Sequence, residues 1–185
     1  MYLLEHDAKE ILASHGIAIP AGRLIGRDET IHRPVLPPGP WVVKGQIAAG
    51  GRGKAGIIRK AATPQELTDH ARAILGTMVK GHVVEEVRIE QQVGGAREAY
   101  LAFLLDPAGG GVRVILSASG GVDIEQVPRE RIFSEIAPAI AEPLVECAHR
   151  LASRLPPEMA LAARAAGERL ARAFLDLEAV LLEIN

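Results

Sequence analysis

A glycine-rich segment holds most of the side chains that could do chemistry in this 185-residue chain. Residues 45–56 read Gly-Gln-Ile-Ala-Ala-Gly-Gly-Arg-Gly-Lys-Ala-Gly, and Lys44 precedes them directly. Glycines let backbone N–H groups approach an anion that a Cβ atom would keep away. Residues 41–60 hold five Lys or Arg and no Asp or Glu, so Lys44, Arg52 and Lys54 have no acid nearby in the sequence. The segment therefore predicts a binding site for a polyphosphate.

Two common phosphate-binding motifs do not fit this segment. Gly51-x-Gly53-x-x-Gly56 matches a dinucleotide fingerprint literally, but that motif opens a helix, whereas the β-branched Ile57 and Ile58 predict a strand. A Walker A loop needs Ser or Thr after Gly-Lys, and here Ala55 follows Lys54. A solvated hairpin with incidental charges is the alternative to a phosphate site.

A second set of polar side chains stands at the ends of predicted strands: Glu90, Glu98, Glu183 and Asn185. Carboxylate and amide oxygens are the ligands that Mg²⁺ prefers, and they also accept hydrogen bonds from ribose hydroxyls. We expect these residues to complete a nucleotide site; the alternative is that each is an ordinary solvated charge at a strand end.

The charge is segregated along the chain although its formal net value is only −2. Residues 1–40 sum to −1, residues 41–60 to +5 and residues 61–185 to −6. This balance, with only six aromatic residues, argues against nucleic acid as a partner. The single cysteine, Cys147, allows no internal disulfide. No apolar stretch suits a membrane span and no signal peptide is evident, so we expect a cytoplasmic protein.

The predicted elements mix hairpin-linked strands with helices, so the fold class is α+β rather than a regular βαβ array. Four prolines between residues 27 and 40 indicate a connection, and Thr63-Pro64-Gln65-Glu66 is a helix-start signal. We expect helices over residues 5–15, 63–75 and, on either side of Pro156-Pro157, 142–176. We expect strands over 41–44, 57–61, 83–93, 98–105, 112–117 and 179–184, with a further extended segment over 122–127.

Several strings strongly resemble the β subunit of succinyl-CoA synthetase, a member of the ADP-forming acyl-CoA ligases. They are Glu5 to Glu10, Trp41 to Lys44, Ala49 to Gly56, Glu98 to Leu101, Ser119 to Glu125 and Leu182 to Asn185. The resemblance implies an ATP-grasp fold, with two α+β lobes and the nucleotide bound between them. The smaller lobe would span residues 22–92 with the glycine-rich loop, and the second lobe residues 1–21 plus 93–185. We expect that second lobe to be incomplete at its C-terminus and the CoA-ligase domain to be absent.

The resemblance also implies roles for single residues, with ATP (or GTP) and Mg²⁺ as cofactors. Lys44 would contact phosphate, and Gly51, Arg52 and Gly53 would fold over the triphosphate. Glu90 and the backbone at Val93 would hold the adenine. Glu98 would lie beside the ribose and metal, Asn185 would bind Mg²⁺, and Glu183 would be the catalytic glutamate that steadies the phosphohistidine loop of the partner.

The implied activity is that of a ligase that forms a carbon–sulfur bond, as in the tricarboxylic acid cycle. The phosphoryl group of ATP would pass to a histidine on a partner α subunit that also carries the CoA site; the isolated chain would not form acyl-CoA. The sequence does not indicate which carboxylic acid is the substrate. Two alternatives stay open: an ATP-grasp ligase with a different acceptor, and a non-catalytic β-like interaction module. Ile57 and Ala102 stand where the family usually has glycine, and Ile57 predicts a stiffer second hinge of the loop.

Overall fold

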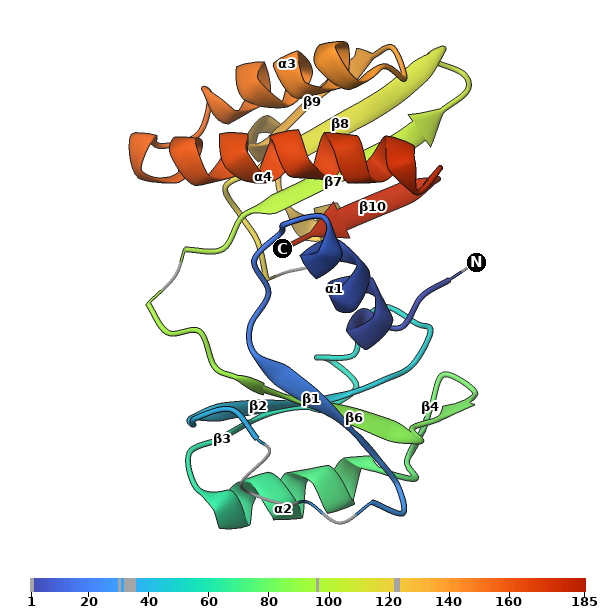
Figure 1. Cartoon of the computed structure of the whole chain (residues 1–185), viewed down its shortest axis with the longest axis vertical. Coiled ribbons are helices and arrows are strands. Elements are labelled where there is room, and N and C mark those ends of the chain that lie inside the picture. Colours follow the sequence, from blue (N-terminus) through green and yellow to red (C-terminus); the bar gives the residue numbers. More distant parts are fainter. Residues whose placement is uncertain (1, 30, 32–35, 96, 122–123) are drawn as a thin grey trace. The chain divides into compact units, whose positions relative to one another are not determined.

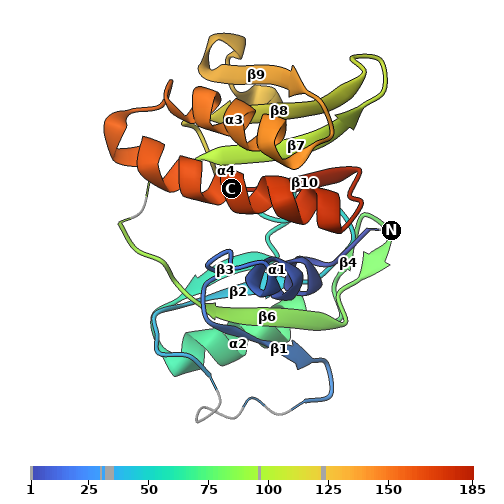
Figure 2. The same cartoon turned by 45° about the horizontal axis from the view of Figure 1, so that its top comes forward.

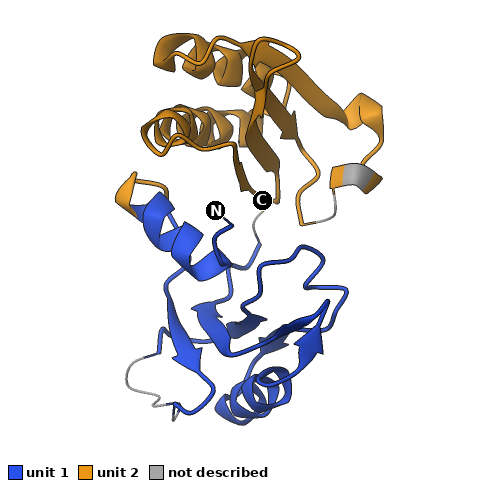
Figure 3. Cartoon of the chain, turned by 90° about the vertical axis from the view of Figure 1, so that its right-hand side faces the viewer, with its two compact units in different colours: residues 1–13, 18–95 blue, residues 14–17, 96–185 orange. Residues whose placement is uncertain are grey.

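The computed structural model describes residues 2–29, 31, 36–95, 97–121 and 124–185. The chain forms two compact units (Figure 3): unit 1 comprises residues 1–13 and 18–95, and unit 2 comprises residues 14–17 and 96–185. The sequence placed residues 1–21 with the second lobe. In the structure residues 1–13 pack in unit 1, because Glu5 and Lys9 form ion pairs with Lys44 and Glu90 of that unit. Among residues 14–17, Gly16 accepts a hydrogen bond from Arg169 of unit 2 (2.6 Å).

Unit 1 is built on a four-stranded antiparallel sheet with strand order β1-β6-β2-β3 (Figure 1). The strands are β1 (Gly22–Gly26), β2 (Trp41–Gly45), β3 (Ile58–Ala61) and β6 (Glu86–Gln91). Helices α1 (Glu5–Ser14) and α2 (Pro64–Ile74) lie on opposite faces of this sheet (Figures 1 and 2). A small hairpin, β4 (Met78–Val79) with β5 (His82–Val83), completes the unit.

The two faces of this sheet differ in chemistry because side chains alternate along each strand. Val43 and Ile89 point into the apolar core that includes Leu67 and Ile74 of α2. Their neighbours Lys44 and Glu90 make ion pairs with residues of α1 on the other face. A capping box begins α2 as predicted: Glu66 N donates to Thr63 Oγ1 (3.2 Å), and Thr63 N donates to Glu66 Oε2 (3.3 Å).

Unit 2 is an antiparallel sheet of order β10-β7-β8-β9 covered by two helices (Figure 1). Its elements are β7 (Tyr100–Asp106), β8 (Gly111–Ser117), β9 (Ile132–Ala137), α3 (Ala141–Ala152), α4 (Pro157–Asp176) and β10 (Leu181–Ile184). Phe103 of β7 and Phe174 of α4 pack with ring centroids 6.0 Å apart in the buried core. None of the helices in the described part of the chain is long and apolar enough to cross a membrane.

The α+β class and most predicted elements are confirmed, with four differences. The sequence did not predict β1, the β4–β5 hairpin or β9. The expected extended segment over 122–127 falls partly outside the described residues, and Ile124–Gln126 forms a 3₁₀ turn instead. The hydrogen bond from Val127 N to Ile124 O (3.1 Å) closes this turn.

Candidate functional site

The two predicted phosphate-binding cations of unit 1 meet at one carboxylate. Lys44 lies near the end of β2, and Arg52 lies in the glycine-rich segment between β2 and β3. Lys44 Nζ is 3.0 Å from Glu5 Oε1, and Arg52 Nη2 is 2.6 Å from Glu5 Oε2. Lys9, one helical turn after Glu5 on α1, places its Nζ 2.7 Å from Glu5 Oε1. A strand, a loop and a helix thus direct three cations at one point.

Glu90, predicted to contact adenine, is buried in this same cluster, with 3% of its surface exposed. Its carboxylate pairs with Lys44, with Lys9 (Nζ to Oε2, 2.6 Å) and with Arg88 (Nε to Oε2, 3.1 Å). The structure therefore brings Lys44, Arg52 and Glu90 together, with the Glu90 carboxylate engaged by cations of unit 1.

Sequence reasoning did not select Glu5, Lys9 or Arg88. Arg88 is fully buried and also contacts Glu10 of α1 (3.2 Å) and the carbonyl of Pro20 (3.2 Å). Two features of the sequence could have indicated these residues. The first is that Glu5 and Lys9 have the i, i+4 spacing of a helical ion pair. The second is that Arg88 and Glu90 are two apart in a strand where they alternate with the apolar Val87 and Ile89, which places both charges on one face.

The opposite charges in this cluster stabilise the charged forms of their partners. Burial alone would raise the pKa of Glu5, but the positive charges of Lys44, Arg52 and Lys9 hold that pKa well below its ordinary value. Burial would likewise lower the pKa of Lys44, but the carboxylates of Glu5 and Glu90 raise it. Both groups are therefore charged at neutral pH.

The glycine-rich segment folds into a tight turn whose backbone favours glycine at two positions. Gly51 and Gly56 have φ angles of +74° and +72°, a region that side chains rarely adopt. Ala55 N donates to Gly51 O (3.1 Å), and Ile57 N donates to Arg52 O (3.3 Å). At Gly53 a Cβ atom would meet no atom within 4 Å, so this part of the turn is open. Ile57 is 3% exposed and anchors the end of the loop in the core.

The remaining predicted site residues, except Val93, lie in unit 2. Glu98 is exposed, and Gly120 and Gly121 pack against it so closely that a Cβ on Gly121 would overlap Glu98 Oε2. Glu183 on β10 accepts a hydrogen bond from Tyr100 Oη (2.6 Å). Asn185 directly follows Ile184, the partner of Leu101 on β7, so Asn185 and Glu98 share one end of this sheet. Val93 is 62% exposed in the segment after β6.

Asn185 and Glu98 carry oxygen donors that could hold a metal ion. In the described ranges, no group of three or more His, Cys, Asp or Glu side chains is placed to hold a metal ion. Mg²⁺ is usually bound through one or two protein oxygens together with substrate phosphates. Asn185 and Glu98 offer hard oxygen donors of this kind.

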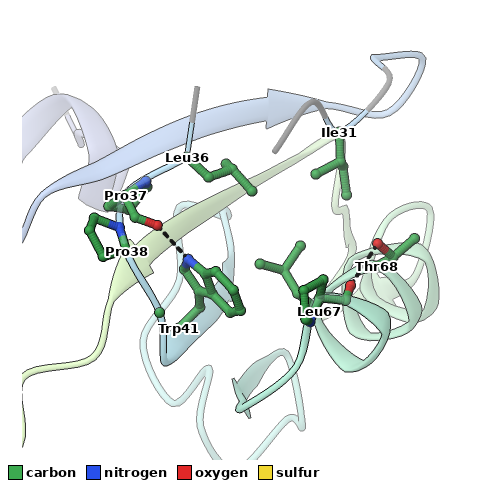
Figure 4. A pocket seen from close by; sticks show the side chains of 9 residues that line it. Ile31, Leu36, Pro37, Pro38, Trp41, Leu67 and Thr68 are labelled. Carbon is green, nitrogen blue, oxygen red and sulfur yellow. Dashed lines mark hydrogen bonds between the residues drawn. The ribbon is translucent and has the colours of Figure 1, made fainter. Parts of the chain in front are cut away.

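The linings of two apolar cavities share no residue with the cation cluster. The first, about 500 Å³, is in unit 1 beside α2; Figure 4 shows Trp41 donating its Nε1–H to Pro37 O (2.7 Å). Its lining includes Ile31, Leu36, Pro38, Leu67 and Thr68. The second, about 420 Å³, lies in unit 2 between α4 and strands β7, β8 and β10, beside the Arg97–Glu158 ion pair. Their largely apolar linings do not offer phosphate chemistry.

Two antiparallel-sheet units, the first with a cationic glycine-rich loop between two hairpin strands, are the arrangement of the ATP-grasp class. A family model described as an ATP-grasp domain matches residues 2–185. The chain therefore belongs to the ATP-grasp family.

The resemblance to β subunits of succinyl-CoA synthetase is confirmed by curated relatives. The chain is 45% identical over 132 residues to the β subunit of GDP-forming succinate–CoA ligase from Thermus thermophilus, covering 71% of this chain and 35% of that protein. It is 41% identical over 132 residues to β subunit 2 of ADP-forming succinate–CoA ligase from Streptomyces coelicolor, covering 71% and 34%. The chain thus spans about a third of the length of these relatives.

Solved structures share the fold at lower identity. ATP citrate lyase from Methanothrix soehngenii, in complex with citrate and coenzyme A, superimposes with a TM-score of 0.74 at 22% identity, over 99% of this chain and 46% of that one. Dinucleotide-forming acetyl-coenzyme A synthetase 1 from Candidatus Korarchaeum cryptofilum gives 0.69 at 19% identity, over 99% and 85%. These likenesses establish the ATP-grasp fold of the chain.

Proposed function

We propose that this chain is the nucleotide-binding portion of an ADP-forming carboxylate–CoA ligase, similar to a succinyl-CoA synthetase β subunit. The observation that carries the proposal is the convergence of Lys44 and Arg52 beside an open glycine-rich turn. Cations of this kind, next to backbone N–H groups that can face an anion, suit the phosphates of a nucleotide. The names of the curated relatives support the ligase class.

In this proposal the chain acts by positioning and by electrostatic stabilisation. Lys44 and Arg52 would offset negative charge on the phosphates, while the backbone at Gly51 and Gly53 would donate hydrogen bonds to phosphate oxygens. Asn185, with Glu98, would hold the Mg²⁺ that accompanies the nucleotide, and this ion would offset further phosphate charge. The segment from Glu90 to Val93 would contact the base.

The acceptor and the acyl chemistry would require a partner. We propose that a histidine on an α subunit accepts the phosphoryl group, that Glu183 steadies the histidine loop, and that the α subunit carries the CoA site. Acyl-CoA formation would then need the complex with its carboxylic acid and CoA. One relative is named as GDP-forming and another as ADP-forming, so both ATP and GTP are candidate nucleotides.

Calorimetric titration of the chain with Mg·ATP and with Mg·GTP tests the phosphate site. We expect saturable binding of at least one nucleotide, weakened roughly tenfold or more by Lys44→Ala, since a charge-assisted contact is lost. Lys60→Ala is the matched control: Lys60 is exposed on β3, pairs across the ladder with Val42, and should leave affinity unchanged. Absence of binding, or equal affinity of wild type and Lys44→Ala, would favour a non-catalytic β-like module.

A further inference from the structure

The carboxylate of Glu5 stands where the cations of unit 1 would receive an anionic ligand. Lys9, Lys44 and Arg52 reach it at 2.7, 3.0 and 2.6 Å, from α1, β2 and the glycine-rich loop respectively. The side chain is 17% exposed, so these charges are poorly screened by water. Carboxylate and phosphate oxygens form the same charge-assisted hydrogen bonds with Lys and Arg.

We propose that Glu5 is an internal competitor of the nucleotide phosphates: it pairs with Lys44 and Arg52 in the nucleotide-free protein and must be displaced when a polyphosphate binds. The inference rests on the proposed function, because it assumes that Lys44 and Arg52 bind phosphate. It adds a residue of the N-terminal helix to the determinants of nucleotide affinity.

The contact between Glu5 and Arg52 is one in which a phosphate oxygen could take the place of the Glu5 carboxylate. Glu5 Oε2 is buried and lies close to Arg52 Nη2, yet it accepts no well-aligned hydrogen bond. Charge attraction therefore dominates this pairing. Arg52 also follows Gly51, whose positive φ marks a turn that favours glycine.

Helix α1 has other anchors that would hold it when Glu5 is displaced. Lys9 pairs with the buried Glu90 (2.6 Å), and Glu10 pairs with the buried Arg88 (3.2 Å). Leu12 is buried as well. Displacement thus needs a side-chain movement at the start of the helix and does not require the helix to detach.

The negative charge of Glu5 would oppose an incoming polyphosphate in two ways. It neutralises the cations before binding, and it repels phosphate oxygens nearby after displacement. Glu5→Gln removes the charge and keeps the size of the side chain. We expect Glu5→Gln to bind Mg·ATP and inorganic tripolyphosphate about tenfold more tightly than wild type, within the usual range of coupling between sites.

The experiment is a calorimetric titration of the full chain, as wild type, Glu5→Gln and Asp7→Asn, with each of the two probes. Asp7 is an exposed acid in the same first turn of α1. Asp7→Asn therefore makes the same change in net charge as Glu5→Gln, and at the same end of the helix. We expect Asp7→Asn to stay within about twofold of wild type, as exposed charges contribute little. Equal or weaker binding by Glu5→Gln would overturn the inference.

The outcomes separate this inference from the proposed function. If wild type binds and Glu5→Gln binds no more tightly, only the inference fails. If neither protein binds either probe, both fail. If only Glu5→Gln binds, both are supported.

Hydrogen exchange of the wild-type chain tests the inference without a variant, for the case in which Glu5→Gln does not fold. Saturating tripolyphosphate should speed exchange in a peptide that covers the first turn of α1 (Glu5–Ser14), and should leave the later turns of α1 and α2 (Pro64–Ile74) unchanged. Unchanged or slower exchange in the first turn of α1 would contradict the displacement of Glu5.

Discussion

At the scale of single residues, the half-buried Glu5 and the buried Glu90 fix the geometry of the cations. Lys44 lies between Glu5 and Glu90, and Arg52, at the tip of a turn, is held by Glu5. Ile57 adds rigidity at the end of the same loop: a Cβ on Gly45 would lie 3.0 Å from Ile57 Cδ1, so the strand and the loop end pack tightly. These contacts support the expectation that Ile57 makes the loop hinge stiffer.

The lowered pKa values of Glu5 and Glu90 predict that unit 1 loses stability in acid. Both pKa values lie below the ordinary 4.5, since burial, which would raise them, is outweighed by Lys44 and its neighbouring cations. The unfolded chain therefore binds more protons, so this contribution is present above about pH 4.5 and is lost as pH falls further. The raised pKa of Lys44 contributes below its ordinary 10.5 and is lost only at still higher pH.

Thermal unfolding between about pH 3 and 7, followed by the fluorescence of Trp41, measures this dependence. Trp41 is the only tryptophan and lies in unit 1, so its signal reports that unit. The midpoint should fall steeply below about pH 4.5 in wild type and less steeply in Glu5→Gln. An equal slope for both proteins would contradict the account of Glu5.

At the scale of elements, the helix pair of unit 2 depends on a glycine. Gly167 is buried in the middle of α4, and a Cβ there would lie 2.8 Å from Ala148 Cβ on α3. Both atoms belong to helical backbones that cannot easily move apart. The close approach of α3 and α4 over the sheet therefore requires glycine despite its low helix propensity.

Gly167→Ala should destabilise unit 2 although alanine favours helices. Overpacking costs about 1–3 kcal/mol, whereas the gain in propensity is about 1 kcal/mol, so we expect a net loss of about 1 kcal/mol. Denaturant unfolding followed by far-ultraviolet circular dichroism measures it. Glu168→Ala, at an exposed neighbouring position, is the control and should change stability by less than about 0.5 kcal/mol. A gain in stability for Gly167→Ala would contradict this prediction, because it would show that α3 and α4 can accommodate a methyl group between them.

Local signals explain which elements the sequence predicted. The β2–β3 hairpin was predictable because Pro40 and Gly45 bound its first strand, and α2 because Thr63 and Glu66 form a capping box. Strand β1 was not, because Gly22–Gly26 is five residues long with glycine at both ends. The ion-pair cluster escaped prediction because Lys9 and Glu90 are 81 residues apart, and no local pattern reports such a contact.

At the scale of the whole molecule, the net charge of −2 is the sum of segments with opposite charge. The +5 of residues 41–60 falls on the hairpin and loop of the candidate phosphate site. The carboxylates that neutralise Lys44 and Arg52, Glu5 and Glu90, come from outside that stretch, from α1 and β6. The fold thus places a strongly basic segment beside acidic residues of other elements, in a protein that is nearly neutral overall.

Nuclear magnetic resonance of the ¹⁵N-labelled chain during titration with Mg·ATP tests the central claim most directly. The account predicts saturable shifts that are largest at the amides of Lys44 and of residues 50–56, with further shifts at Glu5. It also predicts that Lys44→Ala needs more nucleotide to reach them. Saturable binding that leaves residues 50–56 unshifted, or no shifts at any nucleotide concentration, would contradict the assignment of the glycine-rich loop to phosphate binding.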